Sequence, residues 1–261
     1  MIIKIISLKE SIDRREYIHQ QFSKLGLYYD FEDAVDVRSC SKEILNFFSS
    51  KNFELLYGRL PSLGEIGCSI SHDLARKNFL KINNQKTLMV LEDDAKIIST
   101  KDELFSVVKV FEKSKFDILI LGFSKCDNEY EKHINIINPV LPTYKTKNKI
   151  SIGPRYLHST SGAVAYLVNK QSANIMSNIC PKSALADDWK YFSKLGLKIG
   201  YTNPMIIREN TTKLYSTLNH INHSLTHKKS EKLLITILLY IRKYIYGFGR
   251  ITFLYLKHLR K

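Results

Sequence analysis

The chain has 261 residues, of which 44% are hydrophobic, enough for one large domain or for one domain with an appendage. The formal net charge of +15 favours an anionic partner: nucleic acid, an anionic membrane surface or an anionic substrate. No stretch has the ~18 uninterrupted apolar residues of a membrane-spanning helix. We expect no signal peptide in MIIKIISLKESIDRRE, because its apolar run is short and no small-residue cleavage site follows.

Apolar runs alternate with amphipathic stretches along the first 205 residues. The expected strands cover residues 2–8, 29–35, 87–91, 117–123, 163–168 and 198–202. The expected helices cover residues 11–25, 41–48, 62–80, 102–111, 170–179 and 187–195, and the proline-containing stretch 124–160 is expected to be irregular. This alternation predicts an α/β fold with a largely parallel central sheet.

The third expected helix has a recognisable start. Ser62 and Glu65 have the S-x-x-E spacing of a capping box. Ile66, Ile70 and Leu74 then recur every four residues, which predicts one buried stripe through about residue 80.

Three carboxylates follow the strand at 87–91, in the stretch VLEDDA. Ligands of such sheets bind at the carboxyl ends of strands, and an acidic cluster there suits a hard cation such as Mg²⁺ or Mn²⁺. Because strand side chains alternate between faces, we expect Glu92 and Asp94 to face one ligand and Asp93 to point away. The alternative is a solvated acidic turn.

A second acidic pair, Asp187-Asp188, precedes Trp189. A sugar transfer with inversion needs a base to accept the proton of the attacking hydroxyl. The alternative is a helix N-terminus, where aspartate caps the helix and its negative charge interacts favourably with the helix dipole.

The four cysteines form no CxxC pair and no Cys/His metal spacing that we recognise. They are interpreted as reduced, packed thiols of a cytosolic protein. They are Cys40, Cys68, Cys126 and Cys180.

Several segments together resemble glycosyltransferase family 25, the lipooligosaccharide galactosyltransferases of Gram-negative bacteria. The segments are ISLKESIDRRE (6–16), FEDAVD (31–36), LGEIGCSISHDLA (63–75) and LMVLEDDA (88–95), with weaker matches at SGAVAYLVNKQSA (161–173) and ADDWKYF (186–192). The resemblance covers about residues 1–205. It implies a GT-A-like nucleotide-sugar-binding fold, with a glycosyltransferase domain at 1–225 and a basic amphipathic helical tail at 226–261.

The resemblance also implies roles for the acidic residues. Asp94 would hold Mn²⁺ (or Mg²⁺) against the diphosphate of a UDP-sugar, with Glu92 or Asp93 assisting. Glu92 departs from a literal D-x-D motif, which leaves its role less defined. Asp188 is the preferred catalytic base and Asp187 the second candidate.

Five further residues are candidates for donor binding through the same resemblance: Arg14, Arg15, Asp36, Ser71 and His72. The arginines would contact the nucleotide or its phosphates, Asp36 the uridine, and Ser71 and His72 the donor sugar or the metal motif. The alternatives are a helix-surface pair, an ordinary turn acid and a buried packing histidine. His220 and His223 are candidates for a further metal ligand, or else belong to a solvated loop.

Residues 228–261 carry nine Lys/Arg and one acid, Glu231, a net +8 that is about half of the total excess. A mostly apolar helix with a basic stripe is typical of a membrane interface. Packing on the core or on another subunit is the alternative. We expect no nucleic-acid partner, because no known nucleic-acid module is present.

These observations predict a metal-dependent inverting glycosyltransferase that moves a hexose, with galactose as first choice, from a UDP-sugar to a lipid-linked core oligosaccharide. It would act as a peripheral protein on the cytoplasmic face of the inner membrane. The alternatives are a UDP-glucose or UDP-N-acetylglucosamine transferase, or an inactive membrane-docked binding protein.

Overall fold

The computed structural model describes residues 1–124, 128–155, 162–179 and 182–210. It divides into two compact units, and all of the described chain except residues 128–139 belongs to the first. His220, His223, the predicted domain boundary at 225 and the basic tail lie outside the described residues. Within the described ranges, no helix combines the length and apolar character needed to cross a bilayer.

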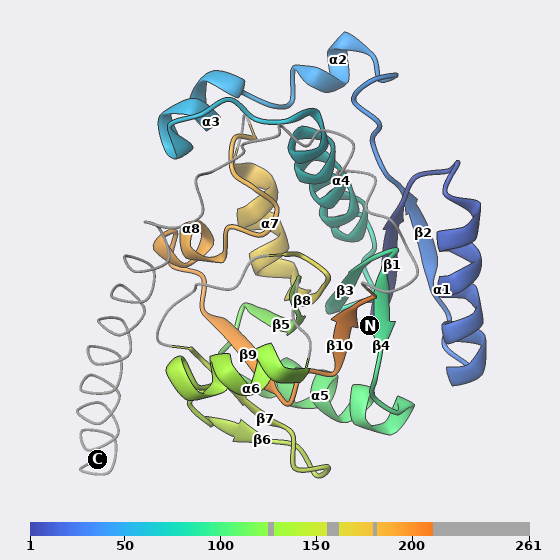
Figure 1. Ribbon diagram of the computed structural model, residues 1–261, viewed down its shortest axis with the longest axis vertical. Helices are drawn as coiled ribbons and strands as arrows, with labels where there is room; N and C mark the ends of the chain where they lie inside the picture. The colour runs from blue at the N-terminus through green and yellow to red at the C-terminus, as the bar shows by residue number, and fades with distance from the viewer. Residues whose placement is uncertain (125–127, 156–161, 180–181, 211–261) are drawn as a thin grey trace, which may run out of the picture. The chain divides into compact units, whose positions relative to one another are not determined.

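The first unit contains strands and helices in alternation (Figure 1). The strands are β1 (Ile2–Ser7), β2 (Asp30–Asp33), β3 (Thr87–Glu92), β4 (Ala95–Ile97), β5 (Ile118–Gly122), β6 (Tyr144–Lys145), β7 (Ser151–Gly153), β8 (Ala165–Asn169), β9 (Ile199–Asn203) and β10 (Ile207–Glu209). The helices are α1 (Ile12–Leu25), α2 (Lys42–Leu45), α3 (Ser50–Tyr57), α4 (Leu63–Leu80), α5 (Lys101–Lys113), α7 (Lys170–Asn178) and α8 (Trp189–Lys194). The second unit contributes α6 (Asn128–Ile137) to the described chain.

The central sheet has eight strands in the order β2-β1-β3-β8-β5-β9-β7-β6, and β4 pairs with β10 separately. β1 is parallel to both β2 and β3, and β5 is parallel to β9. β8 is antiparallel to β3 and β5, and β7 is antiparallel to β9 and β6. Within this described sheet, β8 and β7 therefore oppose the common direction of the other strands. The predicted α/β fold with a largely parallel sheet is confirmed.

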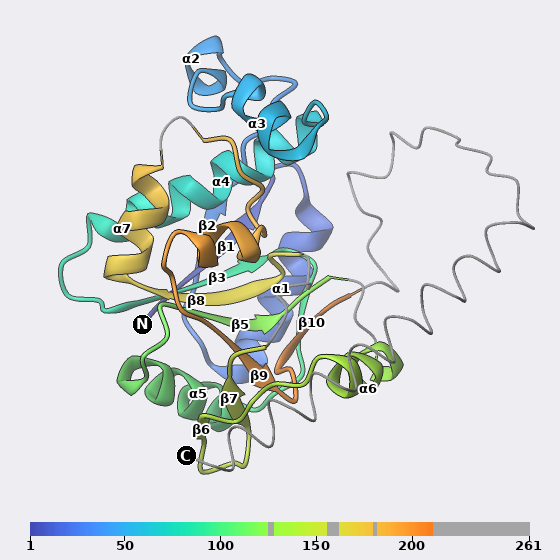
Figure 2. The same ribbon diagram turned by 90° about the vertical axis from the view of Figure 1, so that its left-hand side faces the viewer.

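Helices cover both faces of this sheet (Figure 2). Ile18 and Phe22 of α1 and Val107 and Phe111 of α5 share one core cluster with Met89 and Leu91 of β3. α4 and α7 contact each other on the opposite face. Because side chains alternate along a strand, Leu88 and Val90 point toward the α4 side, and so does residue 92.

The expected irregular stretch 124–160 was wrong in part, since α6, β6 and β7 lie in it. α3, β4 and β10 were also missed. Strands of two or three residues are too short to show a period of two. α3 has only eight residues, and it exposes Leu55 and Leu56 beside the buried Phe53, so its helical period is difficult to recognise in the sequence.

The capping box that begins α4 is confirmed, since the Ser62 hydroxyl accepts from the Glu65 amide and the Glu65 carboxylate accepts from the Ser62 amide. Ser62→Ala is expected to lower the free energy of unfolding by about 1 kcal/mol, because the α4 amide loses its acceptor. Ser62→Thr keeps an acceptor and serves as control. Urea unfolding measures both variants, and equal losses for alanine and threonine would contradict this role.

Candidate active site at the carboxyl end of strand β3

The acidic run lies where β3 ends in the interior of the sheet. Glu92 is the last residue of β3 and is in register with Ile6 of β1. Its amide donates to the carbonyl of Val164, just before β8, at 3.0 Å. Asp93 and Asp94 form the turn into β4. The three carboxylates therefore stand at the carboxyl end of a central strand, as predicted.

Arg14 of α1 joins two of these carboxylates. Its Nη2 lies 2.6 Å from Asp93 Oδ1 and 2.7 Å from Asp94 Oδ2. The three side chains are only 13%, 10% and 16% exposed, so this is a largely buried charge cluster. The expectation that Asp93 points away from Asp94 was wrong, because β3 ends at Glu92 and alternation does not extend into the turn.

The pKa values of Glu92 and Asp94 are both raised to about 7, and burial is the largest cause. The charges of Asp187, Asp93 and Glu209 contribute to the increase at Glu92. Arg14 opposes these effects. Asp94 Oδ1 is buried and makes no hydrogen bond. Excess negative charge around an open carboxylate oxygen fits a divalent cation, which would replace the bound protons.

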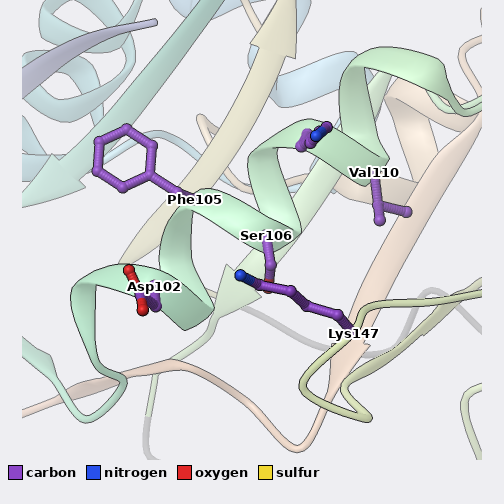
Figure 3. Close-up of a pocket in the computed structure, with 6 residues that line it drawn as sticks. Asp102, Phe105, Ser106, Val110 and Lys147 are labelled. Carbon is purple, nitrogen blue, oxygen red and sulfur yellow. The ribbon is translucent and has the colours of Figure 1, made fainter.

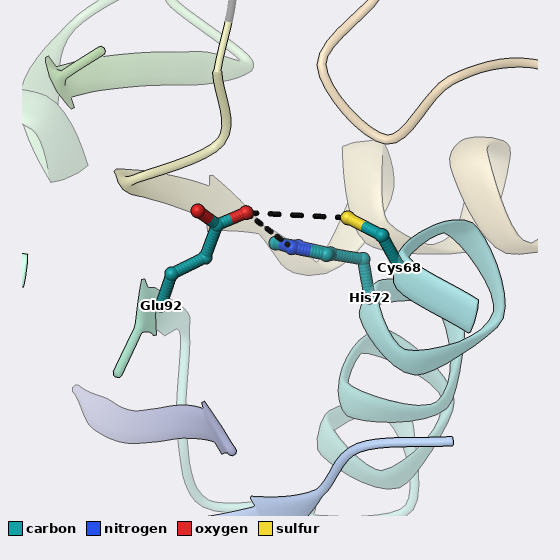
Figure 4. Close-up of side chains that lie close together, drawn as sticks. All are labelled: Cys68, His72 and Glu92. Carbon is teal, nitrogen blue, oxygen red and sulfur yellow. Dashed lines mark hydrogen bonds and ion pairs between the residues drawn. The ribbon is translucent and has the colours of Figure 1, made fainter. Parts of the chain in front are cut away.

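Glu92 itself faces α4. Its Oε1 lies 3.4 Å from His72 Nε2 and 4.0 Å from Cys68 Sγ (Figure 4). His72 Nδ1 is 2.9 Å from the hydroxyl of Tyr166 on β8. Burial, with a further contribution from Arg76, lowers the pKa of His72 to about 3, so its imidazole is neutral at physiological pH.

Cys68 and Tyr166 are not among the site residues predicted from the sequence. A signal for Cys68 existed: it lies four residues before His72, so the two side chains share one face of α4. The interpretation of the four cysteines overlooked this Cys-x-x-x-His spacing, which brings both side chains close to Glu92. Tyr166 had no signal, because its contact with His72 depends on how β8 is paired with β3.

Ser71 ties α4 to the chain that follows β2. Its buried hydroxyl donates to the carbonyl of Gly67 at 2.6 Å and accepts from the amide of Val35 at 2.8 Å. A Cβ at Gly67 would lie 2.5 Å from the Val35 carbonyl oxygen. Gly67 therefore permits the close approach that Ser71 then fixes, and this approach sets the position of Cys68 and His72.

Arg15 and Asp36 lie beside the acidic run rather than in it. Arg15 donates to the carbonyls of Ser7 and Leu8, where β1 ends, and pairs with Asp33 at 2.7 Å. Asp36 pairs with Arg38 at 2.7 Å in the exposed turn after β2. In this structure Arg14 reaches the acidic run, and Arg15 fastens the ends of β1 and β2 together.

The two aspartates before α8 have different surroundings. Asp188 caps α8: its Oδ1 accepts from the Tyr191 amide at 2.9 Å, and its Oδ2 accepts from the Tyr57 hydroxyl at 2.7 Å. Asp187 accepts from the amide of Gly162. Its negative charge raises the pKa of Glu92 and Cys68, so Asp187 acts electrostatically on the acidic run.

A hollow of about 310 Å³ lies elsewhere, along the outer side of α5 (Figure 3). Its lining residues are Asp102, Phe105, Ser106, Lys109, Val110 and Lys147. None of them is a predicted site residue, and the acidic run does not contribute to it. We do not connect this hollow with the chemistry at β3.

Sequence comparison finds relatives whose names refer to glycosyl transfer or to lipooligosaccharide biosynthesis. A Haemophilus influenzae protein named lipooligosaccharide biosynthesis protein lic2B is 22% identical over 253 residues, which is 90% of this chain and 88% of that protein. An Aedes aegypti protein named glycosyltransferase 25 family member is 34% identical over 96 residues, 35% of this chain. The chain spans only 16% of the mosquito protein, and 36% of another H. influenzae relative that is 32% identical over 111 residues.

Among solved structures, a Drosophila beta-1,4-galactosyltransferase 7 crystallised with manganese and UDP-Gal matches 89% of this chain and 78% of its own, at 10% identity and a TM-score of 0.40. The model of Glycosyltransferase family 25 (LPS biosynthesis protein) matches residues 1–189, which include Arg14, the EIGCSISH segment, the acidic run and both aspartates before α8. The chain therefore belongs to glycosyltransferase family 25.

Proposed function

We propose that the chain is a metal-dependent, inverting glycosyltransferase that transfers a hexose from a UDP-sugar to a lipooligosaccharide core acceptor. The observation that supports this most is the buried acidic run at the end of β3, with the unpartnered Oδ1 of Asp94. Family membership supports glycosyl transfer, and the name of the H. influenzae relative supports a lipooligosaccharide acceptor.

The residues fit a hard divalent cation, Mn²⁺ or Mg²⁺. Asp94 would hold it, with Asp93 assisting, because carboxylate oxygens are the ligands that these ions prefer. Glu92, the other predicted assistant, faces His72 and Cys68 of α4 instead. His220 and His223 stay candidates for a further ligand outside the described residues. When bound, the cation supplies positive charge for the diphosphate leaving group.

The chain's own groups position and deprotonate the reactants. Arg14 holds Asp93 and Asp94 in one orientation. The acceptor hydroxyl attacks the anomeric carbon as the bond to UDP breaks, and a carboxylate takes the hydroxyl proton. Asp187 fits this base better than the first choice, Asp188, since both Asp188 oxygens already serve the α8 cap and Tyr57.

UDP-galactose is the first donor to test, with UDP-glucose and UDP-N-acetylglucosamine as alternatives. Thermal unfolding with each donor, with and without Mn²⁺, tests the proposal. A donor at a hundred times its dissociation constant adds about 2.7 kcal/mol to the folded state. Stabilisation by one UDP-sugar only with Mn²⁺ supports it. If no nucleotide stabilises the protein, the transferase proposal fails, and the membrane-docked binding protein becomes the better reading.

Asp187→Asn is expected to lower kcat by about 10²- to 10⁴-fold, the usual contribution of a general base. Asp188→Asn is the matched control: asparagine caps helices as well as aspartate does, so kcat is expected to fall less than tenfold. Transfer of radiolabelled hexose to oligosaccharide released from lipooligosaccharide measures both. A larger loss of kcat for Asp188→Asn than for Asp187→Asn would identify Asp188 as the base.

A further inference from the structure

We propose that Cys68, His72 and Glu92 form a second divalent-metal site, selective for zinc-like ions and separate from the hard-cation site at Asp94. The three ligand atoms come from two elements that the fold fixes against each other (Figure 4). The site is independent of the proposed transfer reaction, and it can exist whether or not the chain binds a UDP-sugar.

The backbone brings the three groups together. Cys68 and His72 are four residues apart, so they project from one side of α4. Glu92 lies on β3 in phase with Leu88 and Val90, which point to the face that α4 covers. All three ligand atoms lie within 4.8 Å of one another.

The distances suit a tetrahedral ion. Bonds of about 2.3 Å to sulfur and about 2.0 Å to nitrogen or oxygen put ligand atoms roughly 3.3 to 3.5 Å apart. The observed separations are 3.4 Å between His72 Nε2 and Glu92 Oε1, and 4.0 Å between Cys68 Sγ and Glu92 Oε1. Cys68 Sγ lies within 4.8 Å of the other two ligand atoms, so binding needs Cys68 to move toward them.

His72 is oriented as a metal ligand. It is fully buried, and its Nε2 makes no hydrogen bond while pointing at Glu92. On its other side, Nδ1 lies 2.9 Å from the Tyr166 hydroxyl, and this hydroxyl accepts from Arg76 at 3.3 Å. A hydrogen bond from Nδ1 to a neighbouring oxygen is the usual outer support of a metal-binding histidine.

The ligand chemistry separates this site from the one at Asp94. Thiolate and imidazole favour zinc-like ions, whereas carboxylates alone favour Mg²⁺ or Mn²⁺. One thiolate and one carboxylate balance the two positive charges of the ion. Metal binding releases the thiol proton of Cys68, a group whose pKa is raised by burial and by the charge of Glu92 in the metal-free protein.

Cobalt(II) is the probe, because a thiolate ligand gives it a charge-transfer band in the near ultraviolet and a tetrahedral field intensifies its visible bands. The full chain, stripped with a chelator, is titrated with Co²⁺ and then with Zn²⁺. We expect a thiolate band that saturates at one Co²⁺ per chain and disappears when Zn²⁺ displaces it. Cys68→Ser is expected to abolish the band, and Cys40→Ser, the matched cysteine outside the cluster, to keep it.

A second protein keeps the test valid if Cys68→Ser misfolds. The triple variant Cys40→Ser, Cys126→Ser, Cys180→Ser leaves Cys68 as the single thiol. In this protein Zn²⁺ is expected to slow alkylation of Cys68 at least tenfold. Tyr166→Phe, which removes the support of His72, is expected to weaken Co²⁺ binding by 10- to 100-fold while the thiolate band remains.

The hard-cation site provides the remaining control. Asp94→Asn is expected to leave the cobalt–thiolate band unchanged while it removes Mn²⁺-dependent nucleotide binding. The band therefore tests the zinc-like site even if no UDP-sugar binds. The inference is overturned if the wild type shows no thiolate band, if the band survives Cys68→Ser, or if Zn²⁺ does not protect the single thiol.

Discussion

Asp94→Asn is expected to abolish the stabilisation of the protein by Mn²⁺ with a UDP-sugar, a loss of about 2.7 kcal/mol at a hundredfold excess over the dissociation constant. The reason is the position of Asp94: one carboxylate oxygen is held by Arg14 at 2.7 Å, and the other is buried without a hydrogen bond. An amide at this position has no negative charge to offer a cation. Thermal unfolding with and without Mn²⁺ measures the loss.

The metal-free variant is expected to be at least as stable as the wild type at pH 8. Burial and the neighbouring carboxylates raise the pKa of Asp94 to about 7, so its ionised form is unfavourable in the folded state. Asp30→Asn, which changes an exposed aspartate paired with Lys4, is the control and keeps the Mn²⁺ response. If the Asp94→Asn protein still binds Mn²⁺ with the nucleotide, Asp94 is not a ligand of the metal.

Arg14→Met is expected to lower the free energy of unfolding by about 3–5 kcal/mol at pH 8, since it leaves Asp93 and Asp94 buried without their positive partner. Arg14→Lys retains a charge and is expected to recover part of the loss. Urea unfolding at pH 8 and pH 5 measures both variants. An Arg14→Met protein as stable as the wild type at pH 8 would show that the ion pairs of Arg14 with Asp93 and Asp94 do not contribute to stability.

The sign of the pH effect follows from the raised carboxyl pKa values. Glu92 and Asp94 have folded-state pKa values of about 7, above their ordinary values, so between about pH 4 and pH 7 the folded state binds more protons than the unfolded state. Stability from these groups therefore falls as pH rises through that range. The Arg14→Met deficit shrinks at pH 5 for the same reason. The charged groups that affect the pKa values of Glu92 and Asp94 are Arg14, Asp93, Asp187 and Glu209.

Local signals in the sequence predicted the scaffold of the site well. The capping box at Ser62 begins α4, and the apolar run before Glu92 forms β3 in the middle of the sheet. Both features depend on residues close together in the chain. The placement of three carboxylates at a strand end followed from these two elements and the strand–helix alternation.

The contacts inside the site could not be predicted in the same way. The pairing of Arg14 with Asp94 spans 80 positions in the chain and depends on α1 packing near the end of β3. Tyr166 reaches His72 because β8 runs antiparallel to β3, a direction that the apolar pattern of β8 does not encode. Tyr57 reaches Asp188 from α3, a helix of eight residues that was not predicted. Such contacts depend on tertiary packing rather than on local propensity.

The arginine on α1 also has a kinetic consequence. Because Arg14 holds Asp93 and Asp94 at 2.6 and 2.7 Å, the turn after β3 acquires its shape when the protein folds, before any ligand arrives. Binding therefore does not include the entropic cost of ordering this turn. Under the proposed function, we expect association of the cation and nucleotide to be governed by diffusion and electrostatic attraction, and differences in affinity among donors to arise mainly from their dissociation rates.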